Sequence, residues 1–273
     1  MTALRLGTFN LLSGRSLPDG LVDPALLSDA VASLDADVLS LQEVDRGQER
    51  SGGRHQAADL AAATGAVAHR YVETVHGTPG ENGWLPAEPA DPADPDADGV
   101  MPGYGIALLS RRPVAEWHVL RMPASRGRFP LLVPGTSRVL WRRDEPRAVV
   151  VAVLESPRMT VAATHLSFVP LFNARQLRRV TRWLERLPAP RLLLGDLNQP
   201  AAVARRVSGW TPLVTGPTYP SPAPREQLDH VLGAGLPDGT RAAGGVRHLP
   251  ISDHRAVVVD LSLPQRGTRN PHD

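Results

Sequence analysis

The sequence predicts an α/β fold in which two packed mixed β-sheets are flanked by helices. Short runs rich in Val, Leu and Ile recur at strand length along most of the 273 residues. A few segments with helical spacing of their apolar residues lie between these runs, and no repeat of fixed period is visible. Such a mixture of strands and helices is typical of a layered protein built around one large core.

The first third of the chain combines strands and helices. Strands are predicted at residues 4–9 and 38–41, and helices after Asp23-Pro24 and over residues 55–63. Asp23 fits an N-cap and Pro24 the first helical position, because the proline ring already holds a helical φ. Gly65 lies where the second helix is expected to end. The first helix has one apolar face, formed by Leu26, Leu27, Ala30, Val31 and Leu34.

The rest of the chain is dominated by predicted strands. Their apolar content places them near residues 104–110, 114–120, 147–154, 159–164, 192–194, 228–232 and 256–263. A helix is predicted over residues 173–187, with an apolar stripe of Leu177, Val180, Leu184 and Leu187. Another face of this helix carries Arg175, Arg178, Arg179, Arg182 and Arg186. We interpret this arginine face as solvated, and Gln176 beside it as hydrogen-bond support.

Three segments differ from this pattern. Residues 77–103 carry many Gly, Pro and Asp residues, which predicts a loop insertion that is either functional or disordered. We expect this insertion, which includes Trp84, to rim the site and tune substrate choice. The stretch 121–147 is rich in arginine and is interpreted as a charged surface loop. Residues 265–273 are expected to form a flexible tail, so that residues 1–264 form one catalytic domain.

Composition excludes several classes of function. The chain has no cysteine, which excludes disulfides, thiolate metal sites and cysteine nucleophiles. All 30 basic residues are arginine, so the sequence pI of about 9.6 is weak support for nucleic-acid binding. No apolar run approaches the roughly 18 residues that span a bilayer, and no signal peptide is visible. We therefore expect a cytoplasmic enzyme with no obligate protein partner.

Polar residues recur where the predicted strands end, and a sheet fixes the positions of such residues. They are Asn10, Glu43, His165, Asp196, Asn198, Asp229, Asp253 and His254. The carboxylates are hard oxygen ligands that suit Mg²⁺ or Mn²⁺. A bound metal would also reverse the repulsion between these carboxylates and an anionic substrate. The two histidines can move protons near neutral pH, so the set is suited to metal-assisted hydrolysis of an anion.

The segments that carry these residues resemble the endonuclease/exonuclease/phosphatase superfamily, which has a deoxyribonuclease I-like fold. They are Thr8-Phe9-Asn10, residues 41–45 (Leu-Gln-Glu-Val-Asp), 105–111 (Gly-Ile-Ala-Leu-Leu-Ser-Arg), Thr164-His165-Leu166, 195–198 (Gly-Asp-Leu-Asn), Leu228-Asp229-His230 and Ser252-Asp253-His254. Their order matches the family, and the resemblance extends over about residues 4–263. It implies a four-layered α/β sandwich with the site at one end of the two sheets.

The resemblance also implies roles. Glu43, with help from Asn10, would bind Mg²⁺, and Asp253 would be a further metal ligand. Asp196 would position or deprotonate the attacking water, while Asn198 fixes its partners. Asp229 would orient His254, which contacts the phosphate or serves as base, and His165 would protonate or stabilise the leaving oxygen. Substrate phosphate would be bound by Asn10, Asn198 and His254.

Two positions depart from the family pattern. Ile106 stands where many relatives have asparagine, and Leu12 stands where some nucleases have an acidic residue. His230 is interpreted as structural, because it should face the opposite side of its strand from Asp229. The other site residues have structural alternatives: Asn10 and Asp253-His254 could be caps, residues 195–198 a turn, His165 a core histidine, and Asp229 the partner of an arginine.

The favoured function is a divalent-metal-dependent phosphoesterase acting on phosphodiesters, with phosphomonoesters as an alternative and a nuclease preferred because many relatives are nucleases. A lipid or small-molecule phosphodiesterase stays open, as does a catalytically silent binding module with the same fold. A zinc peptidase lacks the two histidines at helical spacing that such sites need.

Overall fold

In the computed structural model, which describes residues 2–79, 84–87, 101–132 and 139–264, two mixed β-sheets pack face to face. The first has seven strands in the order β14-β15-β1-β2-β5-β3-β4. Its strands are β1 (Thr2–Asn10), β2 (Val38–Arg46), β3 (Ala68–His76), β4 (Leu85–Pro86), β5 (Gly103–Ser110), β14 (Arg241–Arg247) and β15 (Ala256–Leu263). Its two central strands, β1 and β2, run parallel, whereas the other neighbours are antiparallel.

The second sheet has six strands in the order β12-β13-β11-β10-β9-β6. They are β6 (Val114–Met122), β9 (Arg147–Leu154), β10 (Met159–His165), β11 (Arg191–Asp196), β12 (Thr211–Pro212) and β13 (Asp229–Ala234). Its parallel pair is β10 and β11. A separate two-stranded ribbon is formed by β7 (Arg128–Leu132) and β8 (Val139–Arg143).

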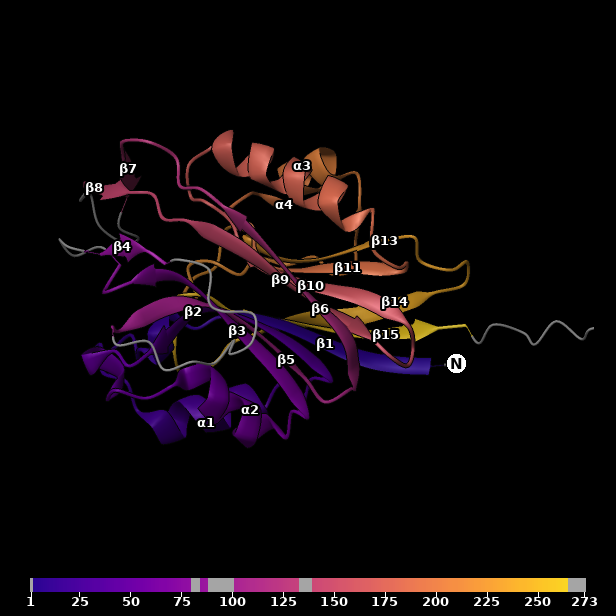
Figure 1. Ribbon diagram of the computed structural model, residues 1–273, viewed down its shortest axis with the longest axis horizontal. Helices are drawn as coiled ribbons and strands as arrows, with labels where there is room; N and C mark the ends of the chain where they lie inside the picture. Colours follow the sequence, from indigo (N-terminus) through magenta and orange to yellow (C-terminus); the bar gives the residue numbers. More distant parts are fainter. Residues whose placement is uncertain (1, 80–83, 88–100, 133–138, 265–273) are drawn as a thin grey trace, which may run out of the picture.

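Helices cover the two outer faces of the sheet pair (Figure 1). On the seven-stranded sheet lie α1 (Pro24–Ala32) and α2 (Gln56–Thr64), and on the six-stranded sheet lie α3 (Phe172–Leu184) and α4 (Ala201–Ser208). Two short 3₁₀ turns, η1 (Leu12–Gly14) and η2 (Glu49–Ser51), follow β1 and β2. None of the helices in the described ranges is long and apolar enough to cross a membrane.

The buried apolar residues form three layers of core, which follow from the alternation of side chains along each strand. Leu6 of β1 and Val161 of β10 lie in the cluster between the sheets. Leu41 of β2 packs with α1 and α2, and Leu193 of β11 packs with α3 and α4. The four-layered α/β sandwich expected from the sequence is therefore confirmed.

The predicted elements of the first third are confirmed with small shifts in their bounds. The Asp23 carboxylate accepts hydrogen bonds from the backbone N–H groups of Ala25 and Leu26, as an N-cap does. Gly65 ends α2 with a left-handed φ of 68°. The strands predicted in the later parts of the chain are all present, as β5, β6, β9, β10, β11, β13 and β15.

Other predictions need correction. Helix α3 ends at Leu184, three residues before the predicted Leu187, because Pro188 disfavours a helical conformation in the residue before it. The stretch 121–147, predicted as a surface loop, contains the end of β6 and the ribbon of β7 and β8. Most of the predicted insertion 77–103 and the predicted tail 265–273 lie outside the described residues.

Strand β2 continues past its predicted end at Leu41, and this places Glu43 inside the strand. The register of β2 against β5 shifts between Gln42 and Val44, so Glu43 occupies a β-bulge with a left-handed φ of 55°. The bulge turns the Glu43 side chain out of the regular alternation, which is a common use of bulges beside functional sites. Glu43 therefore lies at a bulge and not after a strand end.

Gly105 lies opposite this bulge, in the strand paired with Val44. A Cβ at Gly105 would lie 2.1 Å from the carbonyl oxygen of Val72 and 2.9 Å from the Cα of Glu73. These contacts are with backbone, which cannot move aside as a flexible side chain can. We expect Gly105→Ala to lower the free energy of unfolding by about 3 kcal/mol, as overpacking of a core does, measured by urea denaturation.

Gly245→Ala on β14 is the matched control for Gly105→Ala. A Cβ there would meet its nearest neighbour, Arg247 Nη1, at 4.0 Å. We expect Gly245→Ala to change stability by less than about 1 kcal/mol, in either direction. Equal losses of stability in the two variants would contradict the steric account of Gly105.

Candidate functional site

The carboxyl ends of the parallel strands of both sheets meet at one edge of the sandwich. Asn10 ends β1, Glu43 lies near the end of β2, His165 ends β10 and Asp196 ends β11. Asp229 begins β13 opposite Asp196 in the antiparallel register. The remaining three residues, Asn198, Asp253 and His254, lie on the loops that follow β11 and precede β15. The fold thus places all eight predicted site residues at the same edge.

Asn10 connects the two sheets through its side-chain amide. Its Nδ2 donates to Glu43 Oε1 at 3.0 Å and to Asp196 Oδ2 at 3.1 Å, so one amide holds a carboxylate from each sheet. Its Oδ1 accepts a hydrogen bond from the backbone N–H of Leu12. Asn10 is buried at 1% exposure, which makes this bridge a rigid link. In this geometry Asn10 orients two carboxylates, and its oxygen is not turned toward them.

Asp196, Asn198 and His165 form a second set of contacts. The backbone N–H of Asn198 donates to Asp196 Oδ1 at 2.8 Å. The Asn198 Nδ2 lies 3.2 Å from His165 Nε2 and 3.0 Å from the carbonyl oxygen of Leu166. The His165 Nε2 is 3.5 Å from Asp196 Oδ2. Asn173, in the first turn of α3, fixes this loop by donating its Nδ2 to the carbonyl oxygen of Asn198 at 2.7 Å.

Asp229, His254 and Asp196 lie in a row. The Nδ1 of His254 is 2.9 Å from Asp229 Oδ2, and its Nε2 is 3.8 Å from Asp196 Oδ2. All three side chains are buried, and the second oxygen of Asp229 has no hydrogen-bond partner among the described residues. Asp229 thus contacts His254, as predicted, rather than an arginine. Asp229 fixes the orientation of the imidazole, as a carboxylate behind a functional histidine does.

Burial and neighbouring charges set the protonation states of this row. Burial raises the pKa of Asp196 to about 7. Burial alone would lower the pKa of His254, but the carboxylates of Asp229 and Asp196 outweigh it and raise the pKa to about 10. His254 is therefore a cation over the neutral range, held beside a carboxylate that can gain or lose a proton there.

His165 is in the opposite state. Burial lowers its pKa well below 6.5, and the positive charges of Arg147 and His254 add to this effect. A neutral imidazole can accept a hydrogen bond at one ring nitrogen, which matches the approach of the Asn198 amide to Nε2. The site therefore contains one charged and one neutral histidine, set apart by their surroundings.

Two groups of side chains could hold a divalent cation. Among the described residues, Asp196, Asp229 and His254 each offer a ligand atom, all within 4.8 Å of one another. However, Asp229 Oδ2 and the Nδ1 of His254 already bond each other at 2.9 Å. We therefore favour the second group, which is built on Glu43 and Asp253.

Glu43 and Asp253 have the properties expected of carboxylates that bind a cation. Burial raises the pKa of Glu43, and the negative charge of Asp253 raises it further. Burial also raises the pKa of Asp253. The Asn10 amide donates a hydrogen bond to Glu43 Oε1. Hard oxygen donors under mutual repulsion fit Mg²⁺ or Mn²⁺, whose charge would relieve that repulsion.

Backbone strain is concentrated at this edge of the sheets. Glu43, Asn198 and Ser252 each adopt a left-handed φ, of 55°, 48° and 69°, which is uncommon for residues other than glycine. Ser252 donates its Oγ to the carbonyl oxygen of Asn10 at 2.6 Å and accepts from the N–H of His254 at 3.1 Å. Strain held by such contacts is typical of functional sites.

Tyr219 is a site residue that the sequence did not reveal. Its ring centroid lies 4.7 Å from that of His254, with an angle of 42° between the rings. Burial raises the pKa of its hydroxyl, and the charges of Asp253, Asp196 and Glu43 raise it further, so the phenol stays protonated. Tyr219 lies in a Pro-rich loop ten residues before Asp229, and that composition does not indicate that the side chain lies beside His254.

The residues expected to have structural roles lie as follows. The Nε2 of His230 is 2.8 Å from the carbonyl oxygen of Gln199, and the side chain is buried. Ile106 packs in the core between the sheets and has no contact suited to catalysis. Gln176 accepts a hydrogen bond from the backbone N–H of Ser167, the support expected of it. Trp84 is half-buried at a groove that also contains Arg126 and Arg143.

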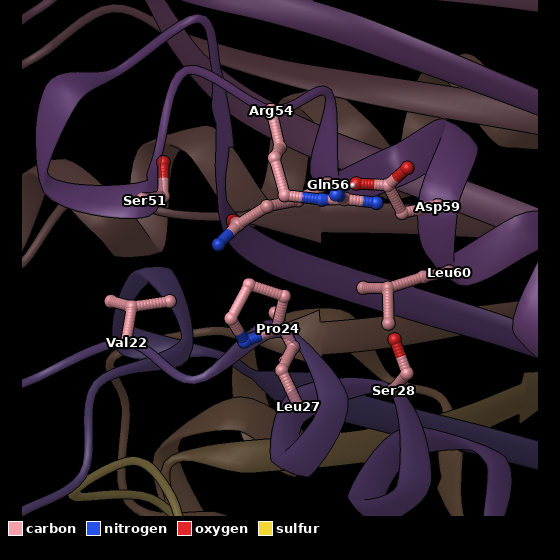
Figure 2. Close-up of a pocket in the computed structure, with 9 residues that line it drawn as sticks. All are labelled: Val22, Pro24, Leu27, Ser28, Ser51, Arg54, Gln56, Asp59 and Leu60. Atoms are coloured by element: carbon pink, nitrogen blue, oxygen red, sulfur yellow. Dashed lines mark hydrogen bonds and ion pairs between the residues drawn. The ribbon is translucent and has the colours of Figure 1, made fainter.

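A separate small pocket lies between α1 and α2 and the turn η2 (Figure 2). Pro24 and Leu27 form its apolar side, while Arg54 and Asp59 form an ion pair at 2.7 Å across from them. Its volume of about 10 Å³ is that of a single water molecule. None of the predicted site residues lines it, so it is not the functional site.

Comparison with solved structures supports the fold. An endonuclease/exonuclease/phosphatase protein from Beutenbergia cavernae DSM 12333 matches 96% of this chain and 72% of its own, with 22% identity and a TM-score of 0.64. The mannosyl-6-phosphatase Bt3783 of Bacteroides thetaiotaomicron VPI-5482 matches 95% of this chain and 100% of its own, with 14% identity and a TM-score of 0.59. Sphingomyelinase C from Streptomyces griseocarneus matches 95% and 99%, with 16% identity and a TM-score of 0.57.

The sequence comparisons complete the assignment. No curated protein matches the chain. The sequence pattern of the Endonuclease/Exonuclease/phosphatase family, in contrast, matches residues 7–254. All eight predicted site residues lie within that match, which ends at His254. The chain therefore belongs to the Endonuclease/Exonuclease/phosphatase family.

Proposed function

We propose that this protein hydrolyses phosphate esters by attack of water, with a divalent cation bound at Glu43 and Asp253. The row of Asp229, His254 and Asp196 is the observation that supports this function most. It sets a protonated imidazole beside a carboxylate whose pKa of about 7 suits a general base. Hydrolysis of a phosphate ester requires a positive charge beside the phosphate and a base beside the attacking water.

Each residue takes a role that its contacts support. Asp196 accepts the proton of the attacking water, while the Asn198 N–H and the Asn10 amide hold its two oxygens. His254 donates from Nε2 to a phosphate oxygen, held in place by Asp229 at Nδ1. Asn198 adds a side-chain amide contact to the phosphate when substrate displaces its present partners, while Asn10 keeps its bonds to Glu43 and Asp196.

Of the two roles implied by the family resemblance, protonating or stabilising the leaving oxygen, His165 takes the second. A neutral imidazole cannot protonate a leaving oxygen, and its Nε2 lies against the Asn198 amide. We assign His165 to positioning Asn198 and the leaving oxygen. A bound divalent cation would polarise the phosphoryl group and stabilise the negative charge that builds up in the transition state.

The substrate class is proposed separately from the reaction type. We favour a phosphodiester, and a nucleic acid among phosphodiesters, as inferred from the sequence, and a cytoplasmic location with it. The names of two structural neighbours, a mannosyl-6-phosphatase and a sphingomyelinase C, keep a monoester and a lipid headgroup as alternatives. We disfavour a silent binding module, because the sequence contains every predicted catalytic residue and Asp229 contacts His254.

The test is hydrolysis of bis(p-nitrophenyl) phosphate and p-nitrophenyl phosphate with Mg²⁺, with Mn²⁺ and with EDTA. We expect release from the diester with either metal and loss of at least about 99% of the rate with EDTA, because the metal carries several kcal/mol of transition-state stabilisation. Release from the monoester alone would replace the phosphodiesterase by a phosphatase. Equal rates with metal and with chelator would overturn the metal-dependent mechanism.

A further inference from the structure

The outer face of α3 carries an unpaired row of arginines. At 100° per residue, the helical arginines Arg175, Arg178, Arg179 and Arg182 fall within one sector of about 100°, opposite the buried stripe of Leu177, Val180 and Leu184. Arg186 follows two residues after the helix ends. All five are exposed. Within the described residues, none of the five has an ion-pair or hydrogen-bond partner for its guanidinium. Positive charges gathered on one face repel one another, and an anion bound beside them would relieve that repulsion.

These arginines line a groove rather than a flat surface. Leu120 of β6 and Trp183 of α3 share the groove with them, and its volume is about 610 Å³. Within α3 the row from Arg175 to Arg182 extends for about 10 Å along the helix, given a rise of about 1.5 Å per residue. A positively charged groove with an aromatic side chain on its flank is the form of a site for a nucleic-acid backbone.

The first turn of α3 lies at the edge of the sheets that holds the candidate site, although Asn173 is on its buried face and Arg175 on its exposed face. Arg175 follows Asn173 by two residues, and the Asn173 side chain bonds the carbonyl oxygen of Asn198. Helix α3 then runs along the outer face of the six-stranded sheet (Figure 1). A strand held along α3 would thus have one end at the edge of the sheets where the candidate site lies.

We propose that this arginine groove binds the phosphodiester backbone of a nucleic-acid strand. The guanidinium fork donates two parallel hydrogen bonds to a phosphate, and successive turns of the helix present one or two forks each. An anionic membrane fits less well, because no large apolar side chain within α3 is exposed to insert into lipid. The proposal rests on the proposed function, because it places the nucleic-acid substrate named there in this groove. Binding by the groove does not require catalysis.

The test measures binding of a fluorescent single-stranded 20-nucleotide DNA by anisotropy, in EDTA, over a range of salt concentrations. We compare the full chain with the triple variant Arg178→Gln, Arg182→Gln and Arg186→Gln. Each lost phosphate contact lowers the salt slope by about 0.7 for a single strand. Loss of three contacts therefore predicts a slope smaller by about 2 and an affinity about a hundredfold weaker at ~0.1 M salt.

A matched control removes three arginines elsewhere: Arg158→Gln, Arg241→Gln and Arg247→Gln, all exposed and all away from α3. The proposal expects this control to bind DNA within about threefold of the unchanged chain, and both triple variants to keep the unchanged rate on bis(p-nitrophenyl) phosphate. An equal loss in both variants would show a general charge effect and overturn the groove. So would binding to phosphatidylserine vesicles through these arginines without binding to DNA.

This design separates two failures. Binding in EDTA does not depend on hydrolysis, so a chain that hydrolyses no ester can still confirm the groove. Conversely, normal metal-dependent hydrolysis with no change of DNA affinity in the α3 triple variant would leave the proposed function intact and reject the groove.

Discussion

Asp196→Asn is expected to lower kcat for phosphodiester hydrolysis by about a thousandfold. The substitution removes the proposed general base, and such groups contribute roughly 10²- to 10⁴-fold. Asn can still accept the hydrogen bond that Asp196 Oδ1 receives from the N–H of Asn198, so the loop that follows β11 keeps its anchor. The measurement is steady-state hydrolysis of bis(p-nitrophenyl) phosphate with saturating Mg²⁺.

The stability of the Asp196→Asn variant distinguishes lost chemistry from lost structure. Burial disfavours the charged form of Asp196, so a neutral amide removes an unfavourable buried charge. We expect the Tm of the variant to equal or exceed that of the unchanged chain. Asp260→Asn, at an exposed position of β15, is the matched control and should change neither kcat nor Tm. A variant with normal kcat would remove Asp196 from the mechanism.

Asp229→Asn is expected to lower kcat by about a hundredfold. Asn can accept the hydrogen bond from His254 Nδ1 but carries no charge, so the imidazole keeps an acceptor and loses its main stabilising carboxylate. Losses of 10- to 100-fold are typical when a partner behind a functional group is changed. KM should change less than kcat, because the substituted atoms do not touch the substrate.

The pH profile tests whether Asp229 acts through His254. With Asp229 present, the pKa of His254 is raised to about 10, so the cation persists across the neutral range and is lost as pH rises through that value. Without the Asp229 charge, burial lowers the pKa and the cation is lost at lower pH. The alkaline limb of kcat/KM should therefore move to lower pH in Asp229→Asn. An unchanged profile with reduced kcat would indicate a purely structural role.

Strong periodicity is what made parts of the fold predictable. The strands β9 and β10 are buried on both faces and β15 is buried over its first half, so their sequences are nearly continuous apolar runs. Helix α1 was equally clear, because an Asp N-cap followed by Pro marks its first turn. The order of the site segments along the chain then indicated the four layers.

Elements with weak periodicity were missed. Strand β14 lies at a sheet edge, and its residues, which include two glycines, are mostly exposed, so nothing in its composition signals a strand. Strand β3 mixes charged and apolar residues because Arg46 pairs with Glu73 within the fold. Helix α4 has one fully buried residue, Ala204, and so lacks an apolar stripe.

The site was predictable in its members but not in its geometry. Residue type and strand-end position identified Asp196 and His254, whereas their protonation states depend on burial that only the packed sheets create. The bulge at Glu43 forms in the pairing of β2 with β5, whose Gly105 follows Glu43 by about sixty positions. Tyr219 reaches His254 through a loop whose path no local pattern encodes.

The rate of bis(p-nitrophenyl) phosphate hydrolysis by the unchanged chain and by Asp196→Asn, each with Mg²⁺ and then with EDTA, tests the central claim most directly. We predict rapid hydrolysis by the unchanged chain with Mg²⁺ and at least about a hundredfold less in the other three conditions. Hydrolysis that persists in EDTA, or that Asp196→Asn retains in full, would contradict a metal-dependent site built on these residues.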